Sequence, residues 1–193
     1  MIRKMILSAG WLIATGILPF GTHTARAASP EIYFGGSFRA QDLQDFNHPD
    51  KLYSLSFSAL GRLPDDSLGQ GWSGWIRGDM GGGVNGGTAL MFAETLAAVE
   101  YRHGPLSLSF AAGPGYHHWN TEVGCNGCGK HEDSSFAGIW EVGTSIHGDS
   151  GGIFGVAIRG IPRERIEVRG SDGRIGTKDL KSLGVTLSWL SRF

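Results

Sequence analysis

The last residues of the chain alternate between apolar and mostly polar side chains. Odd positions from Leu183 to the terminal Phe193 are mainly apolar and include Leu187 and Trp189, whereas the even positions are mainly small or polar, such as Thr186. Side chains of a β-strand point alternately to its two faces, so this pattern predicts a strand with one apolar and one polar face. Its length suits a tilted strand that crosses a bilayer.

A period of two residues also predicts seven strands upstream of the last one. They are residues 32–39, 52–63, 70–80, 89–102, 106–119, 136–147 and 153–168. The alternation is cleanest in the second, where Tyr53, Leu55 and Phe57 are separated by serines. Segment 89–102, rich in Ala, Leu and Glu, reads almost as well as a helix. A strand is the interpretation we favour there, because it brings the total to eight, an even number that allows closure.

The links between these strands indicate how the sheet is connected. Short segments with turn-forming residues follow the second, fourth and sixth strands, and longer segments follow the others. The short links are 64–67, 103–105 and 149–152, and the long ones are 41–51, 81–88, 120–135 and 169–179. Such alternation predicts an antiparallel up-and-down barrel. A soluble barrel with an oily interior is the alternative, but the charges and small residues on the polar faces favour a wet or salt-bridged lumen.

The start of the chain has the pattern of a secretory signal peptide. Residues 3–4 are basic, residues 5–20 form an apolar run, and Ala-Arg-Ala at 25–27 fits a cleavage site. We expect residues 1–27 to be removed, which leaves 28–193 as one domain. A membrane anchor is the alternative, although the run is short and interrupted by glycine. No later stretch is long and apolar enough for a membrane-spanning helix.

Composition narrows the function classes. Charged residues make up 18% of the chain and the formal net charge is −1, which argues against nucleic-acid binding through clustered Lys and Arg. Aromatic residues make up 10%, which argues against a disordered polymer. Glycine, at 32 of 193 residues, suits the tight curvature of a small barrel.

The carboxyl terminus resembles that of a known class of proteins. A last strand that ends on Phe193, with Trp189 on the same face, is similar to the terminal signature of Gram-negative outer-membrane β-barrels, which the barrel-assembly machinery reads. The resemblance covers the whole predicted mature chain and is architectural. It implies an all-β, eight-stranded antiparallel transmembrane barrel in the outer membrane. It also implies a monomer whose partners are the assembly machinery and outer-membrane lipids including lipopolysaccharide, with no nucleic acid.

Four charged residues are predicted to face the lumen at similar height: Arg77, Glu94, Glu141 and Arg159. They should pair, because an unpaired ion in a narrow barrel is costly. A structural plug is the interpretation we favour, which gives the protein a structural or surface-interaction role. A gated, narrow channel or a ligand pocket is the alternative.

Cys125 and Cys128 form a CxxC motif in a predicted long link. In an exported chain the simplest prediction is a local disulfide. A zinc site with His117, His118 or His131 is one alternative, and a redox pair is another. No metal or other cofactor is expected.

A lipid A-modifying enzyme, an acyl hydrolase or acyltransferase, is the alternative function, because several small outer-membrane barrels act on lipid A. Residues near the predicted outer rim supply the types needed for a Ser–His–acid arrangement. The candidates are His117, His118, Glu122, Asp133, Ser134 and Ser135. Lipid A deacylases carry a lipid-facing His-x-Ser pair on a late strand. The nearest match here, Ser145-Ile146-His147, has the reverse order and is predicted to face inward near the opposite end.

Two prolines bear on this alternative. Pro114 and Pro162 lie within predicted strands, where each would remove a ladder hydrogen bond. They would either mark bulges or open a lateral gap through which an acyl chain could enter.

Overall fold

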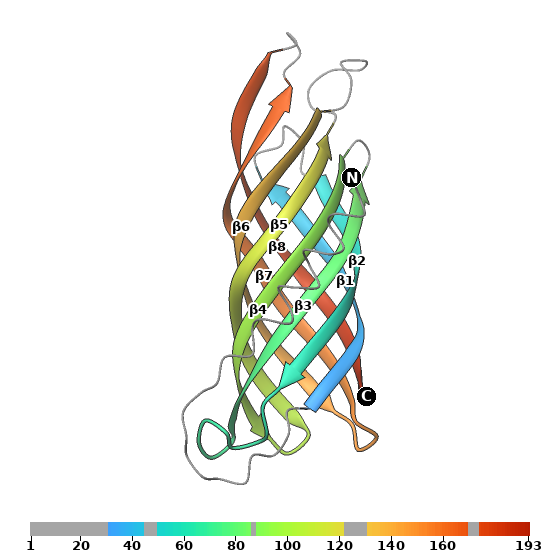
Figure 1. Ribbon diagram of the computed structural model, residues 1–193, viewed down its shortest axis with the longest axis vertical. Helices are drawn as coiled ribbons and strands as arrows, with labels where there is room; N and C mark the ends of the chain where they lie inside the picture. The colour runs from blue at the N-terminus through green and yellow to red at the C-terminus, as the bar shows by residue number, and fades with distance from the viewer. Residues whose placement is uncertain (1–30, 45–49, 86–87, 122–130, 170–173) are drawn as a thin grey trace.

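The computed structural model describes residues 31–44, 50–85, 88–121, 131–169 and 174–193. This part of the chain forms eight β-strands, which pair in sequence order into one closed barrel (Figure 1). The strands are β1 (Glu31–Gln44), β2 (Asp50–Arg62), β3 (Trp72–Asn85), β4 (Thr88–His103), β5 (Leu106–Thr121), β6 (His131–His147), β7 (Gly152–Arg169) and β8 (Ile175–Arg192). Within the described ranges, no helix has the length and apolar character needed to cross a membrane.

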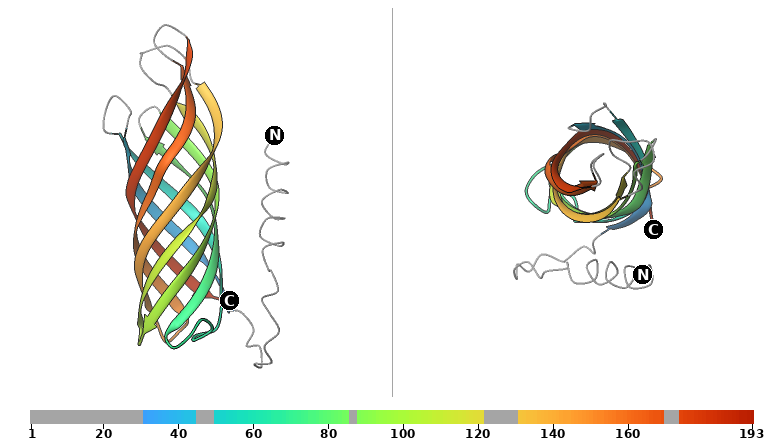
Figure 2. Two further views of the ribbon diagram at one scale, coloured as in Figure 1. Left: turned by 90° about the vertical axis from the view of Figure 1, so that its left-hand side faces the viewer. Right: turned by 90° about the horizontal axis from the view of Figure 1, so that it is seen from above.

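All neighbouring strands are antiparallel, and β1 closes the ring by pairing with β8 from Tyr33–Arg192 to Gln44–Lys181. Viewed along its axis, the barrel is a ring of tilted strands (Figure 2). We call the end with the described links 63–71, 104–105 and 148–151 the turn end, and the opposite end the loop end. The carboxyl terminus lies at the turn end.

The strand alternation places a largely apolar face outside, as the sequence predicts, and turns serines and charged residues inward together with some apolar side chains. Leu55, Phe57 and Leu187 are exposed on the outer surface, whereas Ser54 and Ser58 are buried inside. Large exposed hydrophobic residues occur on every strand. A water-soluble monomer rarely exposes a continuous apolar surface of this kind, whereas lipid tails cover it in a membrane barrel.

Segment 89–102 is a strand, which confirms the interpretation favoured over a helix. In β4, Glu94 and Glu100 are buried in the lumen, and Met91, Val99 and Tyr101 are exposed outside. Pairing with β3 and β5 on both edges satisfies the backbone of β4, so tertiary context overrides the helix propensity of its Ala and Leu residues.

The predicted strict alternation of long and short links is wrong. β3 continues to Asn85 and β4 begins at Thr88, so the predicted long link 81–88 is almost entirely strand. The link between β2 and β3, predicted to be short, runs from Leu63 to Gly71. The glycines at 81–83 read as loop residues, but they allow close backbone contact between strands: a Cβ on Gly81 would lie 2.1 Å from the carbonyl oxygen of Leu55.

Candidate functional site

Eight ionisable side chains from six strands meet in the lumen and form what we call the central charge cluster. Each side chain is at most 6% exposed. The members are Arg39 of β1, Arg77 and Asp79 of β3, Glu94 of β4, His117 of β5, Glu141 of β6, and Arg159 and Glu164 of β7. The four residues predicted from the sequence therefore lie together, and four further residues complete the group.

Arg77 connects two carboxylates in the cluster. Its Nη2 atom donates to both oxygens of Glu141 at 3.0 and 2.9 Å, and its Nε atom donates to Asp79 Oδ2 at 3.0 Å. Asp79 Oδ2 also accepts from Arg39 Nη2 at 2.8 Å. These contacts join β1, β3 and β6 across the lumen.

Glu94 contacts more cationic groups than any other carboxylate of the cluster. It accepts from Arg39 Nη1 at 2.7 Å, from His117 Nε2 at 3.0 Å, and from Arg159 Nη2. Arg159 also lies 3.9 Å from Glu141. Glu94 thus joins three cationic groups, one from each of β1, β5 and β7.

His117 has a carboxylate on each side. Its Nδ1 atom lies 2.9 Å from Glu164 Oε2, and its Nε2 atom lies 3.0 Å from Glu94 Oε1. Carboxylates only accept hydrogen bonds, and both imidazole nitrogens donate only in the protonated ring, so the geometry fits an imidazolium. Four positive and four negative groups then balance in the cluster.

Two apolar layers enclose the central charge cluster. The loop-end layer consists of Leu43, Leu52, Leu90, Phe92, Trp119, Ile166 and Leu180. The second layer, which runs beside the cluster on β6 and β7 and extends to the turn end, consists of Tyr33, Leu60, Trp75, Leu96, Ala111, Ala137, Ile139, Ile153, Ile161 and Leu190. The layers contact the charges directly: the Arg39 guanidinium lies 4.5 Å from the Phe92 ring centre, and that of Arg77 lies 5.4 Å from Trp75. The lumen is therefore filled by side chains.

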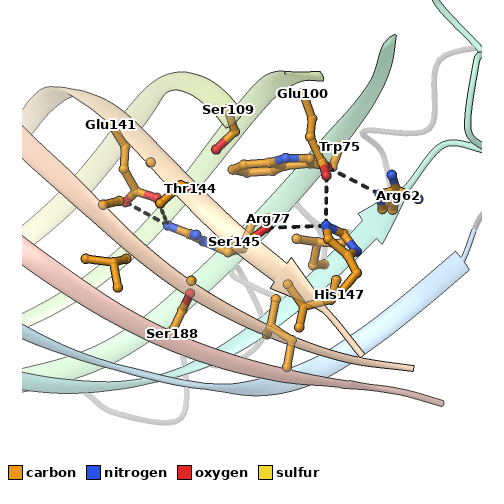
Figure 3. A pocket seen from close by; sticks show the side chains of 17 residues that line it. Arg62, Trp75, Arg77, Glu100, Ser109, Glu141, Thr144, Ser145, His147 and Ser188 are labelled. Carbon is orange, nitrogen blue, oxygen red and sulfur yellow. Dashed lines mark hydrogen bonds and ion pairs between the residues drawn. The ribbon is translucent and has the colours of Figure 1, made fainter. Parts of the chain in front are cut away.

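Below the cluster, a small cavity separates Arg77 and Glu141 from a second polar group near the turn end (Figure 3). In that group, Glu100 accepts from Arg62 Nε at 3.3 Å and lies 3.0 Å from His147 Nε2. The cavity has a volume of about 40 Å³, enough for a few water molecules. Pockets that hold organic ligands are about ten times larger. This cavity is therefore too small for an organic ligand, and the larger hollow, of about 380 Å³, lies at the turn-end mouth around Tyr33 and His147.

The candidates for a Ser–His–acid site divide between the two faces of the barrel wall. His118 and Ser134 face outward near the loop end, and His118 Nδ1 lies 2.9 Å from Ser134 Oγ. His117 and Ser135 face inward, and both bind Glu164. No Ser–His–acid triad forms from these residues within the described ranges, because neighbouring residues of a strand point to opposite faces.

Asp133 and the Ser145–His147 pair have structural contacts instead. The carboxylate of Asp133 accepts from the backbone N–H of Ser134 at 2.7 Å and from that of Glu167 at 2.6 Å. Ser145 faces the lumen, as predicted, and lies 2.6 Å from the hydroxyl of Ser107. His147, also inward, lies at the turn end. Cys125, Cys128 and Glu122 lie outside the described residues.

The two prolines differ in effect. Pro114 still lies opposite Gly138 of β6. The β4–β5 ladder is present before and after Pro114, so this proline opens no gap in the wall. At Pro162 the β7–β8 register shifts between Ile161 and Glu164, which is a bulge. The β6–β7 ladder ends just before it, at the Trp140–Gly160 pair.

The chain has the fold of the small outer-membrane β-barrels. Neisserial surface protein A superposes with a TM-score of 0.60 at 12% identity, covering 84% of this chain and 97% of that one. Ail of Yersinia pestis, in complex with the heparin analogue sucrose octasulfate, gives 0.52 at 10% identity, covering 86% and 100%. The N-terminal β-barrel domain of Pseudomonas aeruginosa OprF gives 0.50 at 11% identity, covering 83% and 99%. No protein-family description and no curated protein sequence matches the chain.

Most cluster members that the sequence prediction missed are also charged or titratable residues on the predicted polar face of a strand. Arg39 and Asp79 fall on the predicted polar faces of their strands. His117 alternates with the outward Tyr116 and His118. Glu164 follows the bulge at Pro162, which reverses the alternation, so a strict period of two assigns it to the wrong face.

Proposed function

We propose that the protein is a closed outer-membrane barrel that conducts no ions. Its role is structural, or it depends on interactions of its outer surface. The filled lumen carries this proposal. The central charge cluster is buried between two apolar layers, and each of its members pairs with a group of opposite charge. Breaking such a cluster leaves buried charges without partners, so the closed state is strongly favoured.

Ion conductance tests the proposal. The protein, reconstituted into a planar lipid bilayer, should give no steady conductance above that of the empty bilayer, whereas a water-filled porin measured in parallel should conduct. A variant with Phe92→Ala and Trp119→Ala, which removes the two largest side chains of the loop-end layer, should still conduct little, because the charge cluster remains. Large, ion-selective conductance of the wild-type protein would make it a channel and refute the proposal.

Residence in the outer membrane is part of the same proposal. The apolar outer surface and the fold support it, as does the predicted signal peptide at residues 1–27. The mature chain should begin at Ala28, be inserted by the barrel-assembly machinery and remain a monomer. Intact-mass measurement of the protein from the outer-membrane fraction checks the start, and electrophoresis of unheated against boiled samples checks closure. Recovery in the soluble fraction would contradict the proposal.

A surface role is supported by one of the similar structures. Ail binds a sulfated sugar analogue in the structure compared above, so a barrel of this fold is able to carry a polyanion. For the present chain we infer a partner in the outer leaflet, with lipopolysaccharide as the expected class.

A second candidate function rests on the outward pair His118 and Ser134. Their 2.9 Å contact is short enough for the imidazole to accept the hydroxyl proton, as in serine-dependent acyl transfer. The pair lies on the outer wall near the loop end, where ester-linked acyl chains of outer-leaflet lipids would reach it. An acyl hydrolase would therefore have its active site on the outer wall and not in the lumen.

Mass spectrometry of lipid A tests the second candidate. Cells that express the wild-type protein should then yield lipid A that lacks an acyl chain, and cells with the Ser134→Ala variant should not. Ser135→Ala is a matched control, because Ser135 faces the lumen. Identical lipid A with and without the protein would remove the enzymatic candidate.

A further inference from the structure

The wall of the barrel is incomplete between β6 and β7 at the loop end. The β6–β7 ladder runs from His147–Ile153 only as far as Trp140–Gly160. On the other side of each strand the pairing continues to the end: β5–β6 to Thr121–His131, and β7–β8 to Arg169–Ile175. The β7–β8 hairpin rises above the rest of the barrel in Figure 1. We call the interval between residues 131–139 and 161–169 the β6–β7 seam.

Side chains close the inner side of the seam in place of the ladder. Ser135 donates to Glu164, and Asp133 accepts from the backbone N–H of Glu167 at 2.6 Å. Ile139 and Ile161 are buried beside them. The seam therefore does not lead into the lumen, and whatever binds it approaches from outside.

The lower part of the outer side of the seam is apolar and poorly filled, whereas Glu132 and Ser134 are exposed farther toward the loop end. Phe136 of β6 is 78% exposed, and Pro162 of β7 is also exposed. A Cβ built on Gly138 has no neighbour within 4 Å, whereas at Gly160 the indole of Trp140 already occupies that space at 2.5 Å. Trp140 thus forms the lower end of a shallow apolar strip that continues upward past Gly138 to Phe136.

Two arginines lie beside this strip on β7, at the level of Phe136, because the neighbouring residues Ser135 and Glu164 contact each other. Arg163 and Arg165 are 61% and 68% exposed and share one carboxylate, Asp179, at 2.8 and 3.6 Å. Two guanidinium groups offer ten N–H donors, more than one carboxylate accepts. The bulge at Pro162 turns Pro162 and Arg163 outward together, so it places a cation beside the apolar strip.

We propose that the β6–β7 seam binds a phosphorylated acyl lipid of the outer leaflet. One acyl chain lies along Phe136, Gly138 and Trp140, and the phosphate binds Arg163 and Arg165. Below Arg163, the outward residues of β7 are apolar through Ile158 and Phe154, so the arginines lie at the border of the lipid-facing surface. A lipid phosphate lies at that border, and arginine binds phosphate in a bidentate manner. This site names a partner for the surface role proposed above and rests on it.

Native mass spectrometry of the detergent-solubilised protein tests the site with three probes: bisphosphorylated lipid A, dephosphorylated lipid A, and inorganic phosphate. The wild-type protein should retain bisphosphorylated lipid A at least about tenfold more tightly than the dephosphorylated form. Inorganic phosphate alone should not compete, because it lacks the acyl chain.

Variants separate the two halves of the site. Arg163→Gln with Arg165→Gln should weaken lipid A binding by about tenfold or more and abolish the preference for the phosphorylated form. Gly138→Leu should weaken both forms of lipid A by filling the strip. The matched controls are Lys51→Gln, which removes an exposed cation from β2, and Gly61→Leu, which fills a similarly open position on β2; both should bind as the wild type does. Electrophoretic closure of each variant confirms that it is folded.

Three results would overturn the proposal: equal binding by the arginine variant and the wild type, equal binding of both forms of lipid A, or equal loss in the Lys51→Gln control. Competition by inorganic phosphate would reduce the site to a simple anion site and would overturn it as well. Conductance recorded from the same preparations tests the closed lumen separately, so failure of the lipid site leaves that result intact.

Discussion

Glu94 is the residue whose loss should destabilise the barrel most clearly. It is the carboxylate that Arg39, His117 and Arg159 share. Glu94→Gln keeps the size of the side chain and removes its charge. The Nε and Nη1 atoms of Arg159 already have no hydrogen-bond partner among the described protein atoms, so its charge then depends on Glu141 at 3.9 Å.

The expected magnitude follows from the burial of these groups. Removing one partner of a buried ion pair typically destabilises a protein by about 3–5 kcal/mol, because the other charge stays buried. Typical folding free energies are about 5–15 kcal/mol, so the change should be visible in the urea midpoint of the protein refolded into detergent micelles. Glu132→Gln, which changes an exposed glutamate on the outer face of β6, is the control and should have little effect.

A second substitution tests the reasoning itself. Arg159→Gln in the Glu94→Gln background removes one charge of each sign and leaves three positive and three negative groups in the cluster. The double variant should therefore be less destabilised than the sum of the two single variants. Additive losses, or a Glu94→Gln variant as stable as the wild type, would show that the cluster does not act as a unit.

Three further predictions concern the wall and the cysteines. Leu187→Arg, on the lipid-facing surface of β8, should cost about 2–4 kcal/mol of folding free energy in bilayers, whereas Thr177→Arg, beyond that surface, should cost little. Gly113→Ala should destabilise the barrel by about 1–3 kcal/mol, because the new Cβ would lie 1.9 Å from a carbonyl oxygen of β4. In Gly61→Ala the new Cβ has no neighbour within 4 Å, so this control should be neutral in the same urea titration. The protein isolated without reductant should show no alkylatable thiol and no bound zinc; two reactive thiols with stoichiometric zinc would exclude the predicted disulfide.

The inside and outside of the barrel were predictable because each face of a strand meets a different environment. The alternating apolar residues 53, 55 and 57 of β2 and 183, 185, 187 and 189 of β8 face outward as expected, and Arg77, Glu94, Glu141 and Arg159 face inward. Alternation fixes only the face. Which charges meet depends on strand stagger and tilt, which bring Arg77 to Glu141 although 64 residues separate them.

Alternation also fails where the backbone departs from a period of two. The bulge at Pro162 adds an outward residue, so Glu164 and Ile166 enter the lumen against the simple pattern. The glycines of β3 wrongly predicted a loop. They are needed because β2 approaches the backbone of β3 closely at these positions, and composition alone does not distinguish such glycines from those of a loop. The end of the β6–β7 ladder at Trp140–Gly160 depends on which residues of the two strands pair, and a single sequence does not specify this pairing.

The central charge cluster also determines how the strands must align as the barrel closes. A slip of two residues along a strand keeps every apolar side chain outside, so the lipid-facing pattern does not distinguish the correct pairing from this error. The same slip moves Arg39 away from both Asp79 and Glu94 and leaves buried charges without partners. Because the partners come from strands throughout the chain, the correct alignment is favoured only when all of them have assembled. The charges in the lumen therefore favour the correct strand register over one that is shifted by two residues.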